Sequence, residues 1–176
     1  MKKLYPGVVS GLVKNLNDPA GLGRIELEFN KVPEPVRSAW ARVAAPMAGK
    51  ERGAFLMPEI DDEVLVAFED GDFNVPYVVG FLWNGQDTPP ESTNQNRVIK
   101  TPGGHELRFE DTGGSKKVIL RSDGGHKVEI DDSAQTITVV TKSGNQKIVL
   151  NDTSSSITIR GGSRQIEMLG GFITMS

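Results

Sequence analysis

The chain has 176 residues, of which 37% are hydrophobic and only 6% aromatic, so it suits one domain or two small ones with aliphatic cores. Its net charge of −3 provides no basic surface of the kind that nucleic-acid binding by bulk electrostatics requires. The absence of cysteine excludes disulfides and thiolate metal sites. No apolar run long enough for a signal peptide or a membrane span is visible, so we expect synthesis in the cytoplasm.

Composition changes sharply near residue 100. All ten prolines lie at or before Pro102, as do both tryptophans, both tyrosines and five of the seven phenylalanines. The polar stretch from Gln86, which includes Pro89-Pro90, has no aliphatic residue and is typical of a linker. We therefore predict a barrel domain at 1–85, a linker at 86–97 and a repetitive domain at 98–176.

The first half contains five runs with strand character. Residues 24–29 alternate strictly between polar and apolar side chains, as a half-buried strand does. Turn sequences at 18–21 and 69–72 separate the runs, and Gly71 can adopt a positive φ. Five short strands in about 80 residues predict a small barrel of the OB type, with an SH3-like barrel or a small sandwich as alternatives. The runs are Tyr5–Val13, Arg24–Phe29, Trp40–Ala45, Glu63–Phe68 and Tyr77–Trp83.

The second half repeats itself. GHELRFED at 104–111 is followed by GHKVEIDD at 125–132, NQKIVLND at 145–152 and a shorter RQIEM at 164–168. The equivalent positions Leu107, Val128, Ile148 and Ile166 are 21, 20 and 18 residues apart. Each unit carries a second apolar pair, and turns rich in Gly, Asp, Ser, Thr and Asn join the segments. The pattern predicts two short strands per unit.

These repeats predict that several chains assemble. Every predicted strand has one apolar face, so a single meander leaves that face uncovered. We expect an all-β protein in which three copies turn these faces inward as an intertwined β-helix or β-prism, while polar residues such as Arg108, Glu129, Thr138, Thr158 and Arg160 face outward. The alternative is that the meander packs on the barrel of its own chain. The predicted trimer core is Leu107, Phe109, Val118, Leu120, Val128, Ile130, Ile137, Val139, Ile148, Leu150, Ile157, Ile159, Ile166 and Met168.

The first half also resembles a known family. The order PEIDDEVLVAF at 58–68, then Gly71-Asp72, then PYVVGFLWNG at 76–85 resembles the OB domain of phage baseplate assembly protein V and of VgrG spike proteins, as do segments 7–9, 18–19, 23–27 and 40–43. The second half is similar to the family's three-chain needle. The resemblance implies a homotrimeric central spike of a contractile injection machine, located in a virion tail baseplate or an injector particle, made in the bacterial cytoplasm and driven through an envelope without enzymatic activity.

The resemblance also implies partners. VgrG carries a hub domain ahead of its OB domain, whereas here the OB pattern begins near residue 5, which implies a separate baseplate hub protein at the N-terminal side. Some phage spikes insert a lysozyme domain where only the short linker lies here. The last residues continue the apolar alternation, so we predict that Phe172, Ile173 and Met175 bind a PAAR-type tip protein. The alternative is that these residues fold over and cap themselves.

Other candidate sites carry weaker signals. The carboxylates at 61–63 and 69–72 are more typical of solvated loops than of a metal or acid–base site, because they lack the spacing of a calcium loop. His105 and His126 occupy equivalent repeat positions, which favours a reused turn over a metal site. We therefore predict no catalytic residues, no metal ligands and no cofactor. The rival functions are an OB-fold nucleic-acid-binding module, for which Phe29 and Trp40 are the candidate stacking residues, and a cell-wall hydrolase.

Overall fold

A computed structural model describes residues 5–29 and 36–175 of the chain. The chain divides into two compact units, Met1–Thr88 and Pro89–Ser176. Strands dominate both units, and no helix in the described ranges is long and apolar enough to cross a membrane.

The first unit is built on one curled sheet. Its strand order is β3-β2-β1-β7-β8-β4, and neighbouring strands are antiparallel except for β4 and β8, which are parallel. A small hairpin of β5 and β6 and a 3-10 turn η1 (Glu69–Gly71) complete the described part of the unit. The strands are β1 (Val8–Asn15), β2 (Glu26–Phe29), β3 (Val36–Arg37), β4 (Arg42–Val43), β5 (Ala48–Gly49), β6 (Arg52–Gly53), β7 (Glu63–Phe68) and β8 (Pro76–Leu82).

Two backbone hydrogen bonds close the sheet into a barrel. The Ile25 N–H donates to the Ala41 carbonyl at 2.9 Å, and the Ala41 N–H donates to the Ile25 carbonyl at 2.7 Å. Ile25 directly precedes β2 and Ala41 directly precedes β4, so strands that are far apart in the sheet order are joined at this point. A small closed barrel leaves few unpaired strand edges.

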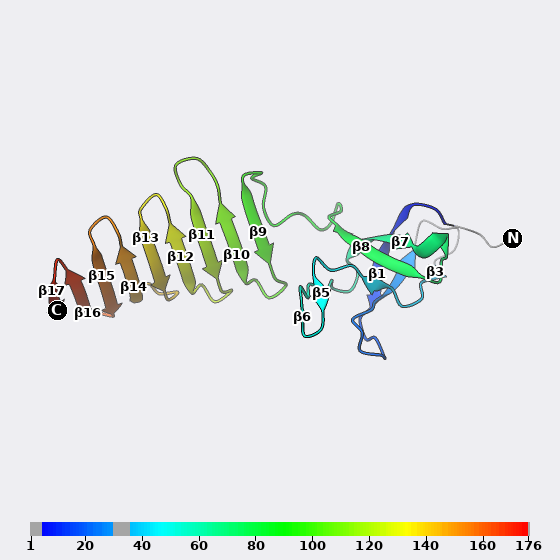
Figure 1. Ribbon diagram of the computed structural model, residues 1–176, viewed down its shortest axis with the longest axis horizontal. Coiled ribbons are helices and arrows are strands. Elements are labelled where there is room, and N and C mark those ends of the chain that lie inside the picture. The colour runs from blue at the N-terminus through cyan, green and yellow to red at the C-terminus, as the bar shows by residue number, and fades with distance from the viewer. Residues whose placement is uncertain (1–4, 30–35, 176) are drawn as a thin grey trace. The chain divides into compact units, whose positions relative to one another are not determined.

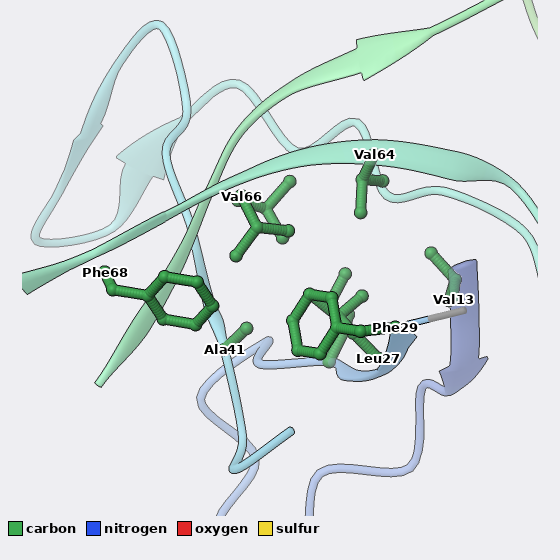
Figure 2. Close-up of a cluster of buried hydrophobic side chains, with 9 residues drawn as sticks. Val13, Leu27, Phe29, Ala41, Val64, Val66 and Phe68 are labelled. Carbon is green, nitrogen blue, oxygen red and sulfur yellow. The ribbon is translucent and has the colours of Figure 1, made fainter. Parts of the chain in front are cut away.

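The barrel interior holds aliphatic side chains and one aromatic cluster (Figure 2). The alternation of residues 24–29 is confirmed, because Ile25, Leu27 and Phe29 are buried while their neighbours are half-buried. Phe29, Phe68 and Phe73 lie with ring centroids 5.3–5.8 Å apart, a favourable aromatic spacing. The buried core consists of Val13, Ile25, Leu27, Phe29, Ala41, Val64, Val66, Phe68 and Val78.

Five strands were expected in the barrel, and the structure differs in detail. The run predicted at 40–45 pairs regularly only at β4, and β3, β5 and β6 were not predicted. Each of these strands has two residues, which is too short for a period of two to show in the sequence. Both predicted turns are confirmed: η1 places Gly71 at φ 73°, and Asp18 folds the turn at 18–21.

Asp18 holds its loop together. Its carboxylate accepts hydrogen bonds from the backbone N–H of Ala20 and Leu22, both at 3.0 Å, and contacts the Arg24 guanidinium at 2.7 Å. The Arg24 hydrogen bond, aided by these N–H groups, holds the pKa of Asp18 well below its usual range. The side chain is 3% exposed, so this short loop is fixed from within.

The second unit is an antiparallel meander in which each strand pairs with the strand next to it in sequence (Figure 1). Nine strands are described, one more than the eight predicted, because β9 precedes the first repeat and begins inside the segment expected to be linker. The strands are β9 (Asn96–Lys100), β10 (Glu106–Glu110), β11 (Lys117–Arg121), β12 (Lys127–Asp131), β13 (Thr136–Val140), β14 (Gln146–Asn151), β15 (Ser156–Gly161), β16 (Arg164–Leu169) and β17 (Phe172–Met175).

The repeated histidines lie in repeated turns. The Nδ1 of His105 accepts a hydrogen bond from the Asp123 N–H at 3.3 Å, and the Nδ1 of His126 accepts one from the Lys142 N–H at 3.4 Å. Each histidine thus braces the corresponding turn of the next repeat. Gly104 in the first turn has φ 83°, and a Cβ there would lie 2.5 Å from an Asp123 oxygen, so the turn requires glycine.

Candidate assembly surfaces

One face of the second sheet carries two continuous apolar rows. The strand register places Leu107, Leu120, Val128, Val139, Ile148, Ile159 and Ile166 side by side in the first row. The second row consists of Phe109, Val118, Ile130, Ile137, Leu150, Ile157 and Met168. The structure therefore brings all fourteen predicted core positions onto one face.

No described element of the second unit covers this apolar face. The side chains in its middle remain about two-fifths exposed, for example 40% at Ile148 and 41% at Ile159, although they contact their cross-strand neighbours. Soluble proteins rarely expose contiguous apolar patches of this extent unless the patch binds something.

Three residues extend the rows beyond the predicted list. Ile99 pairs with Leu107, and Ile173 and Met175 pair with Met168 and Ile166. Ile99 was missed because β9 lacks the repeat motif and its residues, NRVIK at 96–100, do not alternate between polar and apolar. The apolar face therefore runs from β9 to β17.

The opposite face is mainly polar, as expected from its alternating residues. Glu106 is 5% exposed and lies between Arg108 Nε at 2.8 Å and Arg121 Nη2 at 3.1 Å. The Arg108 hydrogen bond, with a further contribution from Arg121, lowers the pKa of Glu106. Ile119 and Val149 also lie on this face and are half-buried, which the simple alternation did not predict.

A segment ahead of β9 is fixed to the polar face. The Glu91 carboxylate lies 2.5 Å from Arg108 Nη1 and accepts hydrogen bonds from the Thr93 N–H at 2.8 Å and Asn96 Nδ2 at 3.0 Å. These donors, the Thr93 N–H first, lower the pKa of Glu91 to about 2. Part of the predicted linker is thus bound to the sheet.

The last hairpin divides the predicted tip residues between the two faces. Ile173 and Met175 continue the apolar rows, whereas Phe172 pairs with Leu169 on the opposite face. Phe172 is 76% exposed, Ile173 69% and Met175 80%, so the three do not form one cluster within the chain.

The barrel has an apolar groove of its own. It has a volume of about 630 Å³ and is lined by the β5–β6 hairpin, by the residues that follow it and by β8. Leu22, Met47, Phe55, Leu56 and Phe81 line it and are each at least 50% exposed. Sequence analysis did not single this groove out, although the apolar run at 54–57 was visible.

The carboxylate clusters have structural partners. Asp61 pairs with Lys14, Asp62 accepts a hydrogen bond from the Glu59 N–H at 2.8 Å, and Glu69 lies 2.5 Å from the Tyr77 hydroxyl. In the described ranges, three or more His, Cys, Asp or Glu residues do not gather in a metal-binding arrangement.

The candidate nucleic-acid stacking residues are not both available. Phe29 is 2% exposed and belongs to the barrel core, so it cannot stack on a base without unfolding the strand. Trp40 is half-buried. This placement argues against the nucleic-acid alternative.

The comparisons with known proteins agree with this geometry. Residues 9–83 match the family model of the type VI secretion system/phage-baseplate injector OB domain. The chain is 37% identical over 94 residues to the type VI secretion system spike protein VgrG5 of Pseudomonas aeruginosa. It is 32% identical over 93 residues to the spike protein VgrG3 and to the actin cross-linking toxin VgrG1, both of Vibrio cholerae.

These alignments cover 48% of this chain but only 12%, 9% and 8% of the three relatives, respectively. The family match spans β2 to β8 and nearly all of β1, so it identifies the barrel. The barrel is therefore similar to the type VI secretion system/phage-baseplate injector OB domain, and the chain resembles VgrG spike proteins over the aligned part only.

Proposed function

We propose that the chain is the central spike of a contractile injection machine, working as a homotrimer that pierces an envelope and has no enzymatic activity. The observation that carries the proposal is the uncovered apolar face of the second sheet in a chain whose first unit is an injector OB domain. Three copies with these faces inward would bury both apolar rows along the whole meander.

The energetics favour such burial. Eleven of the fourteen row positions are 37–43% exposed, and completing the burial of one such side chain is worth roughly 1 kcal/mol. The fourteen positions of one chain extend over strands β10 to β16, which is more sheet than one small barrel could cover. A closed prism also protects its strands from peeling, which suits a rod loaded along its axis.

The mass in solution tests the assembly. We expect three times the 19.1 kDa chain mass by light scattering. A well-folded monomer would refute the homotrimer. Single-stranded DNA filter binding and a peptidoglycan zymogram test the two rival functions, and we expect both to be negative.

We propose that a baseplate hub protein binds the barrel groove. The groove offers exposed apolar side chains, and Phe55 at 79% exposure is a natural anchor. Phe55→Asp should abolish capture of the hub protein, while Val36→Asp, on the short edge strand β3 away from the groove lining, should leave it intact. Equal capture by both variants would exclude the groove.

We propose that the C-terminal hairpin binds a PAAR-type tip protein. Ile173 and Met175 continue the core rows to the last described strand, so three copies would present six such side chains at one end. Deleting 171–176 should leave the trimer intact and abolish tip-protein capture. Because Phe172 lies on the other face, Phe172→Ser should weaken capture less than Ile173→Ser; the reverse order would place the contact on the outer face.

A further inference from the structure

The two long edges of the second sheet carry opposite charges. We define the basic edge as the turns after β9, β11, β13 and β15 with the two strand residues on either side of each turn. In the described chain it carries seven basic and two acidic side chains: Lys100, Arg121, Lys127, Lys142, Lys147, Arg160 and Arg164, with Glu106 and Asp123.

The acidic edge comprises the turns after β10, β12, β14 and β16 with the two strand residues on either side of each turn. It carries five acidic and two basic side chains: Glu110, Asp111, Asp131, Asp132 and Asp152, with Lys116 and Lys117. Seven of the ten basic residues after Arg97 therefore lie on one edge, and five of the nine acidic residues lie on the other.

Contacts within the chain neutralise only part of these charges. Lys117 pairs with Asp131 at 2.8 Å. Among the ion pairs between described residues, none involves Lys142, Arg164, Asp132 or Asp152. All four are exposed; Lys142, Asp132 and Asp152 lie in turns and Arg164 is the first residue of β16, so each edge keeps charges that are free to meet a partner.

Resting on the proposed trimer, we propose that the basic edge of one copy pairs with the acidic edge of the next copy. Copies that run in the same direction with their apolar faces inward set unlike edges side by side. Copies that run in opposite directions would set like edges together, which costs free energy through charge repulsion. The edge charges therefore select a parallel assembly, which the apolar rows alone do not.

The meander topology gives these edges a matching spacing. Turns of the basic edge follow odd-numbered strands and turns of the acidic edge follow even-numbered strands. In copies at the same height, each basic turn is offset by one strand spacing, about 4.8 Å, from the acidic turns of its neighbour. Lys142 would then lie between Asp132 and Asp152 of the next copy, within reach of both.

The shape of the apolar face fits this arrangement. A hollow of about 390 Å³ runs from Val128 and Ile148 to Lys147 on the basic edge. A second hollow, of about 690 Å³, runs from Ile137 and Leu150 to Asp132 and Asp152 on the acidic edge. Each hollow thus reaches charged or polar residues of the edge beside which the next copy would lie.

Charge reversal tests the pairing in the full chain. The basic-edge variant is Lys142→Glu with Arg164→Glu, the acidic-edge variant is Asp132→Lys with Asp152→Lys, and the combined variant carries all four changes. Each two-site variant should exchange subunits about tenfold faster than the native protein at low salt, because two favourable contacts per interface become repulsive. The combined variant should return to near the native rate, since its edges are again complementary.

The salt dependence separates charge pairing from damage to the fold. The difference between the two-site variants and the native protein should shrink at about 1 M salt, where the Debye length is about 3 Å. The edge pairing would be refuted if both two-site variants exchange subunits at the native rate, or if the combined variant exchanges no more slowly than they do. Either result could be obtained while the native protein still has the mass of a trimer. A native monomer would instead refute the proposed function on which the pairing rests.

Discussion

Replacing Ile148 by aspartate should dissociate the proposed trimer. Ile148 lies mid-row between Val139 and Ile159 and is 40% exposed in the single chain. Losing its remaining burial removes roughly 1 kcal/mol per chain. Placing a carboxylate in the closed core adds several kcal/mol per ion. Three copies together cost on the order of 10 kcal/mol per trimer, enough to populate monomers at micromolar concentration.

The neighbouring residue provides the matched control. Val149 lies on the opposite face of the same strand, between Thr138 and Thr158. Val149→Asp removes a similar aliphatic side chain without charging the proposed core, so it should stay trimeric with a modestly lower melting temperature. Sedimentation velocity at several concentrations measures both variants. An Ile148→Asp protein that remains trimeric and melts like Val149→Asp would refute the inward orientation of the rows.

Three further predictions follow from the same contacts. Asp18→Asn should lower the unfolding midpoint of the barrel by several degrees, because the ion pair with Arg24 is lost. Thermal melts measure this midpoint, and Lys14→Gln is the control, which shows whether the effect is specific to the Asp18 loop. The pKa of Glu91 is about 2, below its ordinary value of 4.5, so the stability that the ionised carboxylate contributes is complete above pH 4.5 and is lost as the pH falls towards 2. Glu91→Gln should therefore reduce the dependence of the unfolding free energy on pH between 4.5 and 2. An unchanged pH dependence would contradict this prediction. The assembled needle should resist denaturing detergent at room temperature, and gel migration as a monomer in unheated samples would count against a closed prism.

The repeats allowed most of the second unit to be predicted. Its two-residue alternation and its 18- to 21-residue steps specify strand pairing, register and one apolar face, because a one-residue slip would move every side chain to the other face. The tip contact of Phe172, Ile173 and Met175 was predicted from hydrophobicity, and only the strand register shows that Phe172 lies on the opposite face from the other two.

The barrel was less accessible to sequence reasoning. Its closure depends on two hydrogen bonds between Ile25 and Ala41, which lie in different strand regions and show no local signal. The groove beside Phe55 is lined by β8 and by the β5–β6 hairpin, whose strands have two residues each. Strands of this length are too short to show a periodic pattern in the sequence. The edge charges of the meander were present in the sequence, but they separate into two edges only after the turns are assigned alternately to each side.

Neighbour-only pairing in the meander has a consequence for how the needle forms and changes. Because every strand from β9 to β17 pairs with the next strand in sequence, its contacts are local and its contact order is low, which favours rapid zippering from any nucleus. Because each strand pairs only with its neighbours in sequence, the sheet can be lengthened or shortened by one hairpin at a time. Adding or removing one hairpin keeps the alternation of faces and edges and changes the length of the sheet by about 10 Å. The length of the proposed needle can therefore change while the sequences of its two ends stay the same.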